Sequence, residues 1–561
     1  MLILEDTEAA EWVKSRPINQ DVGSPSSLRA ARLCLEECHA NHEDCKQDQS
    51  VIPSRLVEIS SNGQIKLITT KSRAFDYCAL SYCWGGDQSY KTTMDKLTEY
   101  HENIDIPRTA KTIHDAVTVT SSLGLRYIWI DALTIIQDSE EDKIQELSRM
   151  PGIYKGAFIT LVASSAASSS EGFLQERKLQ NSVFRLPFRC PSGILSSVYL
   201  YEMPKKDDSD DPVQKRAWCL QESILSPRII KFSGDRVHWN CHTPLEAMSE
   251  HGWYQYGLSN QDHALIEKLN SVKSLTVSSN AITDSTKEFI LARVKIAWPP
   301  KELDSALQEW MRIISRYSQR QLTVPSDKLV ALAGVAAEFA HSIAASPDGF
   351  PSQYAAGLWY RDLERQLLWK RTSQTLPTRP QAYYAPTWSW ASINSPVQIL
   401  GSYVPVLQII RHEVHLKNSE LLYGEVTAAL LTVKGRVKQA FLTKAGTRIQ
   451  DRNLLGYESL FIASATIDAN EDYGINTSKL PVWLLEVGLH EARTSIGIVI
   501  VPAELSDEAD FKDSLPSDSK HADVGLLDAS SSPYWDSNCD THFHHKGTRT
   551  APLICNKINR K

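Results

Sequence analysis

The sequence contains few cysteines and no long apolar run. Only ten cysteines occur in 561 residues, so we expect a reduced, intracellular protein with free buried thiols rather than a disulfide scaffold. No stretch reaches the roughly 18 apolar residues of a transmembrane helix. The opening segment, MLILEDTEAAEW, carries acids and no basic cluster, so we expect no secretory signal and a cytoplasmic location.

Basic residues are not in excess. The chain has 60 Lys plus Arg and 67 Asp plus Glu, a formal net charge of −7, so no nucleic-acid partner and no anionic membrane surface is expected. Hydrophobic residues make up 42% and charged residues 23%, which is typical of a globular protein and excludes a collagen-like or globally disordered chain.

Common catalytic motifs are also absent. The sequence has no GxSxG, no GxxxxGK[ST], no HExxH and no GxGxxG, so the enzyme classes that depend on these motifs are not indicated. It contains no internal repeat.

A helix predicted over residues 28–45 carries several metal-binding residue types. Cys34, Cys38, His42 and Cys45 share one face by the helical period, and a zinc site is one hypothesis. On a straight helix, however, Cys34 and Cys45 lie about 16 Å apart, so one ion cannot bind all four unless the helix breaks. We therefore favour a packed helix face and predict no metal site.

Residues 75–164 alternate between short apolar segments and helical segments. Strands are predicted at 77–84, 126–131 and 158–163, and helices from Pro107 to near Gly124 and over 138–150. This order and spacing predict a parallel α/β sheet.

We predict five regions along the chain. They are a helical N-terminal lead-in (1–74), an α/β domain (75–228), a mainly helical region (229–395), a β-rich region (396–503) and a mostly disordered tail (504–561). The helical region rests on two apolar stripes that begin at Leu303 and Leu329. The β-rich region rests on short apolar segments at 404–410, 429–433, 460–465, 482–487 and 496–501. The tail is rich in Asp and Ser and lacks periodicity.

Three sequence blocks in the α/β region form a long and specific pattern. They read YCALSYCWG at 77–85, LGLRYIWIDALTIIQD at 123–138 and RAWCLQE at 216–222, followed by LSPR at 225–228. Together they resemble the fungal heterokaryon-incompatibility (HET) domain from its opening motif to its closing block. Further segments, such as APTWSWA at 385–391, resemble the C-terminal regions of large fungal proteins of this group, so the resemblance covers roughly residues 30–500.

The sequence departs from the family pattern at two positions. The family usually has Cys where this chain has Thr134, and Asp-Trp-x-x-Glu where this chain reads DKIQE at 142–146. Lys143 therefore replaces the Trp, whereas Glu146 is kept.

The resemblance implies a fold and a catalytic candidate. The HET domain is similar to the Toll/interleukin-receptor (TIR) domain, which has a flavodoxin-like parallel sheet. Some TIR domains cleave NAD with a Glu on a helix after a central strand, and Glu146 holds the equivalent place in the order of elements. The resemblance thus makes Glu146 a catalytic candidate with NAD as a candidate substrate. A solvated position beside Asp142 and Lys143 is the alternative.

A ligand-binding set is expected at the strand ends, because parallel sheets bind ligands beyond the carboxyl ends of their strands. Ser81, Tyr82, Trp84 and Gly85 end the first strand, and Asp131 ends the second. The aromatic rings offer stacking, the glycine permits close approach, and the carboxylate offers stabilisation of an oxocarbenium-like cation when nicotinamide leaves. The structural alternative is that Trp84 packs in the core and Asp131 caps a helix.

The closing block contributes a structural motif of Arg216, Trp218, Gln221, Glu222 and Arg228. For its charged members we favour an ion-pair network inside the domain over contacts with a ligand.

Three functional hypotheses follow from the resemblance, which implies nonself recognition between fungal strains and programmed cell death after incompatible cells fuse. The first is a signalling module that assembles with an allelic or non-allelic incompatibility protein, or with itself. The second is a NAD glycohydrolase-like effector that depletes NAD. The third is a diverged HET-domain protein without incompatibility activity. The substitutions at Thr134 and Lys143 favour this third hypothesis. We find no nucleotide-oligomerisation module or WD repeat in the sequence after the HET block, so we expect no built-in receptor of that kind.

Overall fold

The computed structural model describes residues 9, 20–177, 183–201, 211–242, 305–344, 353–375, 377, 380, 382–400, 403–419, 421–443, 448–451, 461–464, 479–489, 494–502, 522–530 and 541–543. The chain divides into two compact units, Met1–Asn270 and Ser271–Lys561. Each unit is described by itself.

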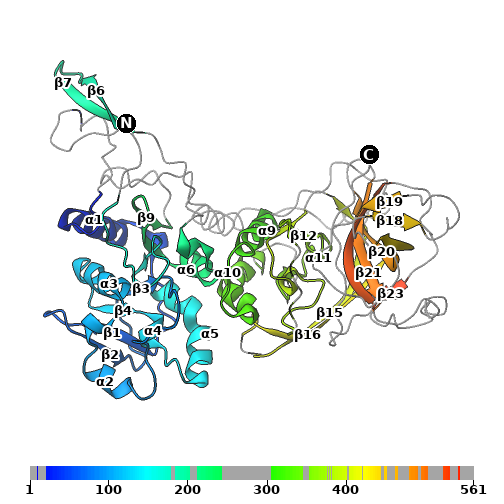
Figure 1. The fold of residues 1–561 in the computed structure, drawn as a ribbon, viewed down its shortest axis with the longest axis horizontal. Helices are drawn as coiled ribbons and strands as arrows, with labels where there is room; N and C mark the ends of the chain where they lie inside the picture. The colour runs from blue at the N-terminus through cyan, green and yellow to red at the C-terminus, as the bar shows by residue number, and fades with distance from the viewer. Residues whose placement is uncertain are drawn as a thin grey trace, which may run out of the picture. The chain divides into compact units, whose positions relative to one another are not determined.

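The first unit is built on a mixed sheet of seven strands in the order β2-β1-β4-β3-β5-β8-β9 (Figure 1). The strands are β1 (Arg55–Ile59), β2 (Ile65–Thr69), β3 (Tyr77–Ser81), β4 (Tyr127–Trp129), β5 (Ile159–Val162), β8 (Arg228–Phe232) and β9 (Val237–Cys241). The central strands β4, β3, β5 and β8 are parallel, whereas β1, β2 and β9 pair antiparallel at the edges. The predicted α/β fold is confirmed, and the parallel strands follow the order of a flavodoxin-like sheet.

The three predicted strands form the middle of this sheet. All residues of β3 and β5 are buried, as expected for parallel strands that are covered on both faces. Because β4 and β5 lie on opposite sides of β3, right-handed crossovers put the helices that follow β3 and β4 on opposite faces.

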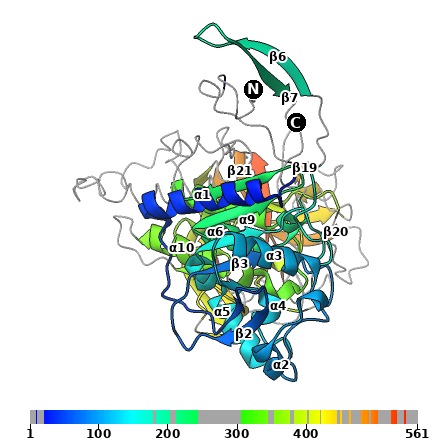
Figure 2. The same ribbon diagram turned by 90° about the vertical axis from the view of Figure 1, so that its left-hand side faces the viewer.

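Helices cover both faces of the sheet. They are α1 (Pro25–Asn41), α2 (Leu97–Glu102), α3 (Lys111–Ser122), α4 (Asp131–Thr134), α5 (Glu140–Gly156) and α6 (Trp218–Leu225). Helix α1 contacts α3, and α5 contacts α6; Figure 1 shows the sheet between these two pairs, and in Figure 2 α1 and α3 face the viewer. Local sequence starts α5, because the Ser139 side chain caps it and acidic residues fill its first turn.

The sheet extends beyond the boundaries expected for the α/β domain. Strands β1 and β2 lie in the segment 1–74, which was expected to be a helical lead-in. Strand β8 begins at residue 228, where the domain was expected to end, and β9 lies beyond it. Unlike β3 and β5, the strands β1, β2 and β9 are only partly buried, so they lack the continuous apolar run that marks a buried strand. Strands β6 (Val183–Arg189) and β7 (Leu195–Tyr201) form an antiparallel hairpin that the sequence pattern did not predict.

The described part of the second unit begins with two helices at the predicted apolar stripes, α9 (Ser305–Tyr317) and α10 (Ala333–Ala344). They are followed by short elements: β10 (Tyr354–Ala355), β11 (Leu358–Trp359), α11 (Leu363–Gln366), β12 (Trp369–Arg371) and β13 (Val397–Ile399). Their core is rich in buried tryptophans: Trp310, Trp359, Trp369, Trp388 and Trp390. Residues 243–304 of the predicted helical region lie outside the described residues.

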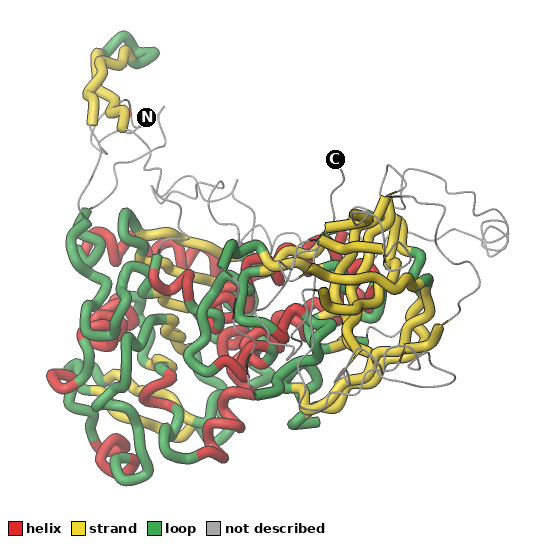
Figure 3. The backbone as a smooth tube through the Cα atoms, turned by 45° about the vertical axis from the view of Figure 1, so that its right-hand side comes forward, coloured by secondary structure: helices red, strands yellow, loops and turns green. Residues whose placement is uncertain are grey.

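The further regular elements that the structure describes in the second unit are strands (Figure 3). They are β14 (Val404–Pro405), β15 (Gln408–Leu416), β16 (Val426–Gly435), β17 (Val437–Thr443), β18 (Arg448–Asp451), β19 (Phe461–Ser464), β20 (Lys479–Leu489), β21 (Thr494–Pro502), β22 (Ala522–Ser530) and β23 (Thr541–Phe543). Antiparallel pairing closes β20, β17, β18, β19, β22 and β21 into a ring, and β15, β16 and β23 form a separate sheet.

The expected disordered tail needs a correction. Strands β22 and β23 lie within 504–561 and pair with strands of the β-rich region. Long-range pairing supplies these strands with partners that local composition does not reveal. In the parts of the chain that the structure describes, no helix has the length and apolarity needed to cross a membrane.

Candidate functional site

Trp84 and Asp131 meet at the carboxyl edge of the parallel strands. Trp84 follows β3 and Asp131 begins α4 directly after β4, and Trp84 Nε1 donates a hydrogen bond to Asp131 Oδ2 at 2.9 Å. Asp131 Oδ1 accepts from the backbone N–H of Ala132 at 2.7 Å. Burial raises the pKa of Asp131, although the Arg216 guanidinium and the Trp84 hydrogen bond oppose the shift. Asp131 thus lies at the strand end that the sequence suggested, but it is the first residue of α4 and not its N-cap, which is Ile130.

The two loops after β3 and β5 pack closely against each other. A Cβ on Gly85, whose φ is 74°, would lie 2.5 Å from Ser168 Cβ. Gln88 Nε2 donates to Trp84 O at 2.7 Å, and Ser169 Oγ donates to Gln88 Oε1 at 2.7 Å. The close approach that Gly85 permits is therefore made to another loop of the domain.

A buried charge cluster adjoins this edge. Arg216 Nη1 donates to the main-chain oxygen of Tyr82. Glu222, on α6, is only 5% exposed. Burial raises the pKa of Glu222, and the Arg216 guanidinium opposes the shift. Burial disfavours the charged form of Arg216, but Cys219 and Glu222 hold its pKa above the ordinary value. A carboxyl group that is raised in pKa beside a guanidinium is a common feature of functional sites.

The five predicted ligand-binding residues differ in their access to solvent. Ser81 and Tyr82 are 1% and 2% exposed, so neither reaches a ligand at the surface. Trp84 and Asp131 are partly buried, and Gly85 is exposed. The structure therefore gathers the set at one edge, and three of its members reach the surface.

Glu146 belongs to a different set of contacts. It is 0% exposed on α5, Ser54 Oγ donates to its Oε1 at 2.5 Å, and Arg149 Nη1 lies 3.5 Å from the same oxygen. One turn earlier, Asp142 forms an ion pair with Arg55 at 2.5 Å. The solvated alternative for Glu146 is therefore wrong, and its segment ties α5 to the start of β1.

Comparison with known protein families assigns this region. Residues 77–222 match the family described as heterokaryon incompatibility protein (HET). This chain contains a HET domain. The match runs from the first residue of β3 to Glu222 on α6, so it includes the Trp84–Asp131 contact and Arg216. No curated protein and no solved structure gave a match to the chain.

Of the two substituted positions of the HET domain, Thr134 is buried and hydrogen-bonded. Thr134 is 0% exposed, and its Oγ1 donates to Ile130 O at 2.8 Å. Arg55 Nε donates to Thr134 O at 2.7 Å. Lys143 is partly buried on α5.

The residues of the closing block of the HET domain do not lie together in one cluster. Arg216 and Glu222 lie at the carboxyl edge, whereas Arg228 is 1% exposed and donates to Phe158 O at 3.0 Å and to Cys38 Sγ at 3.3 Å. Gln221 is fully buried and Trp218 partly so. The ion-pair network expected for Arg216, Glu222 and Arg228 therefore does not join all three, because Arg228 lies apart and donates to a main-chain oxygen and a thiol.

The N-terminal metal-binding residue types also meet in an unexpected way. Ligand atoms of Cys38, His42, Cys45 and Cys241 all lie within 4.8 Å of one another. The prediction of no metal site assumed one straight helix, but α1 ends at Asn41. Cys241 was missed, because no local pattern connects it with residues so far away in the sequence.

Proposed function

We propose that this HET-domain protein acts in fungal nonself recognition leading to programmed cell death. It does so in the cytoplasm as a signalling module, by binding an allelic or non-allelic incompatibility protein or a second copy of itself. The HET domain supports a relation to incompatibility systems. The burial of Glu146 favours binding over catalysis.

Glu146 carries this argument because a catalytic carboxylate must reach its substrate. Its side chain is 0% exposed, and one carboxylate oxygen faces both Ser54 and Arg149. Asp142, one turn away, is engaged with Arg55 in the same way. These contacts fit a carboxylate that fastens a helix to a strand.

An NAD glycohydrolase-like effector is the second candidate, and Glu222 is the residue that favours it. Two carboxyl groups with raised pKa, Asp131 and Glu222, flank Arg216 near the strand ends. Trp84 is partly exposed there and offers a surface for a flat ring. In this alternative the partly exposed Asp131, rather than Glu146, would stabilise the ribosyl cation, and the buried Glu222 would position Arg216 beside it.

The test is the time course of NAD and viability after induction of the full chain in a fungal host. Wild type is compared with Glu146→Gln, Glu222→Gln and a control, Glu141→Gln, which changes an exposed residue of α5. We expect wild type to kill cells while NAD stays steady, and Glu222→Gln to kill as wild type does.

Two outcomes would contradict the proposal. A fall in NAD before viability drops, absent in Glu222→Gln and present in Glu141→Gln, would support the effector. The second outcome is that the cells stay healthy with steady NAD, even after fusion with a strain of the opposite incompatibility type. This result would favour a diverged protein without incompatibility activity.

A further inference from the structure

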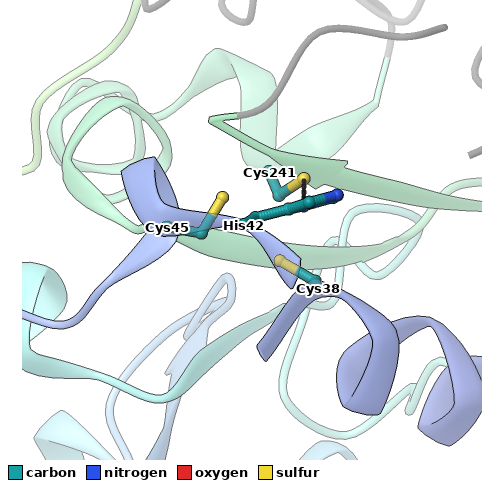
Figure 4. Close-up of side chains that lie close together, drawn as sticks. All are labelled: Cys38, His42, Cys45 and Cys241. Carbon is teal, nitrogen blue, oxygen red and sulfur yellow. Dashed lines mark hydrogen bonds between the residues drawn. The ribbon is translucent and has the colours of Figure 1, made fainter. Parts of the chain in front are cut away.

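Four metal-binding side chains from three elements converge in the first unit. Cys38 lies in the last turn of α1, His42 follows that helix, Cys45 ends a 3-10 turn (Glu43–Cys45), and Cys241 ends β9. Figure 4 shows His42 between the three thiols, with Cys241 on the neighbouring strand. His42 Nδ1 and Cys241 Sγ lie 3.6 Å apart.

The break in the helix is what brings these residues together. The backbone of His42 is extended, with φ −108° and ψ 102°, so the chain turns after Asn41 instead of continuing the helix. The 3-10 turn then directs Cys45 back toward Cys38. Cys34, one turn before Cys38, shares the buried helix face but lies outside the cluster.

We propose that Cys38, His42, Cys45 and Cys241 bind one Zn²⁺ in a tetrahedral site. Three thiolates and one imidazole are a ligand set that proteins use for structural zinc. With Zn–S bonds of about 2.3 Å, a tetrahedron separates sulfur atoms by about 3.8 Å. The four ligand atoms already lie within 4.8 Å of one another, so inward movements of less than about 1 Å complete the geometry.

The surroundings match the charge of such a site. Zn²⁺ with three thiolates carries a net charge of −1, and Arg228, which is 1% exposed, donates its Nε–H to Cys38 Sγ at 3.3 Å. Hydrogen bonds of this kind stabilise metal-bound thiolates. Three of the ligands, Cys38, Cys45 and Cys241, are buried, and His42 is partly exposed.

The site's role is structural, because all four coordination positions are filled by protein and none is open for a substrate. It fastens the N-terminal helix to the edge strand β9. A second link lies beside it, since His242 Nδ1 and Asp44 O are 3.2 Å apart. The inference does not depend on whether the HET domain signals or cleaves NAD.

The test is metal analysis of the full chain, purified without chelators, by inductively coupled plasma mass spectrometry. We expect about one zinc per chain in wild type and a loss of zinc affinity of at least about tenfold in Cys241→Ser and Cys45→Ser. The matched control is Cys34→Ser, which removes a buried thiol on the same helix outside the cluster and keeps its zinc. Removal of zinc from wild type lowers its thermal midpoint.

A second measurement needs no variant. Wild type loaded with Co²⁺ should show the visible absorption bands of a tetrahedral cobalt site together with thiolate-to-cobalt charge transfer. The proposal is overturned if wild type neither contains zinc nor competes with a chromophoric chelator for it. It is also overturned by an octahedral cobalt spectrum, by a disulfide among Cys38, Cys45 and Cys241, or by equal zinc loss in Cys34→Ser.

Discussion

Glu146 is a buried carboxylate with a structural role, because it connects α5 to the residue before β1. Arg149, one turn further along α5, lies close to the Glu146 carboxylate and also donates a hydrogen bond to Ser54 Oγ at 3.0 Å. Ser54 in turn donates to Glu146, so the three side chains form a closed set between α5 and the residue before β1. Since hydrogen bonds to a buried charge contribute more than neutral ones, this contact stabilises the domain.

Glu146→Gln should therefore destabilise the first unit. The amide keeps the shape of the side chain but loses the charge-assisted bond, at a cost of about 1.5–3 kcal/mol. Urea unfolding followed by far-UV circular dichroism measures the change. Glu141→Gln, at an exposed position of the same helix, should leave the midpoint unchanged. Equal midpoints for Glu146→Gln and wild type would contradict the structural role.

Lys328 is a buried amine in the second unit. It is 6% exposed, its ammonium donates to Ile393 O, and its Nζ lies 5.3 Å from the centre of the Trp390 ring. Burial lowers the pKa of Lys328 to about 7. The side chain therefore loses its proton in the folded state at a pH where the unfolded chain still holds it.

This shift predicts a stability that rises with pH. Between about pH 7 and 10 the unfolded state binds more protons than the folded state, so the free energy of unfolding increases as pH rises through this window. Lys328→Met should remove that slope, and Lys417→Met, which changes a largely exposed side chain, should keep it. Thermal midpoints at pH 7, 8 and 9 are the measurement. A slope that persists in Lys328→Met would assign the pH dependence to other groups.

At the scale of elements, the loops at the carboxyl edge are held mainly by one another. Gly85 sits where a Cβ would overlap Ser168, and Trp84 bridges to Asp131. The sequence suggested that Gly85 leaves room for a ligand, but the loop after β5 occupies that space. Trp84 and Asp131 are partly exposed at this edge.

Gly85→Ala should destabilise the HET domain for two reasons. Its φ of 74° is strained for alanine, and the new methyl group would meet Ser168 at 2.5 Å. Gly63→Ala is the matched control, because Gly63 has a φ of 84° with no atom within 4 Å of an added Cβ. We expect about 1–2 kcal/mol for the control and a further 1–3 kcal/mol, roughly, for Gly85→Ala. Equal losses of unfolding free energy in the two variants would show that loop packing contributes nothing.

At the scale of the whole molecule, the folding unit is larger than the HET match. Residues 77–222 include β3, β4 and β5 but omit β1 and β2 on one side and β8 and β9 on the other. Helix α1 is omitted too, although its apolar face belongs to the same core as the sheet. A fragment cut at the limits of the match would expose the apolar faces that these elements cover.

Two fragments test this prediction. Residues 20–242 should yield a folded fragment with a cooperative thermal transition, because they contain all seven strands and α1. Residues 77–222 should aggregate or remain unfolded, since they lack four of those strands. Circular dichroism and size-exclusion chromatography give the answer. A monomeric, cooperatively unfolding 77–222 fragment would contradict the prediction.

Some features of the sheet could be predicted from the sequence because their signals are local. Continuous apolar segments mark β3 and β5 as buried strands, and Ser139 with its acidic successors marks the start of α5. Strands β1 and β9 have no such local signal in the sequence. They are short and partly exposed, and they form strands because they pair with the edges of the parallel sheet.

The sequence by itself determined the parallel α/β core, the apolar stripes of α9 and α10, and the motif blocks of the HET domain, because periodicity and motif spacing are properties of neighbouring residues. The tertiary structure alone decided that Glu146 is buried, that Gly85 faces Ser168, and that Cys241 joins Cys38 and His42. These facts depend on side chains that are far apart in the chain and meet only when the sheet is assembled. Burial and long-range contact set the chemistry of a carboxylate or a thiol, so the chemistry of this protein's sites became readable only in the folded chain.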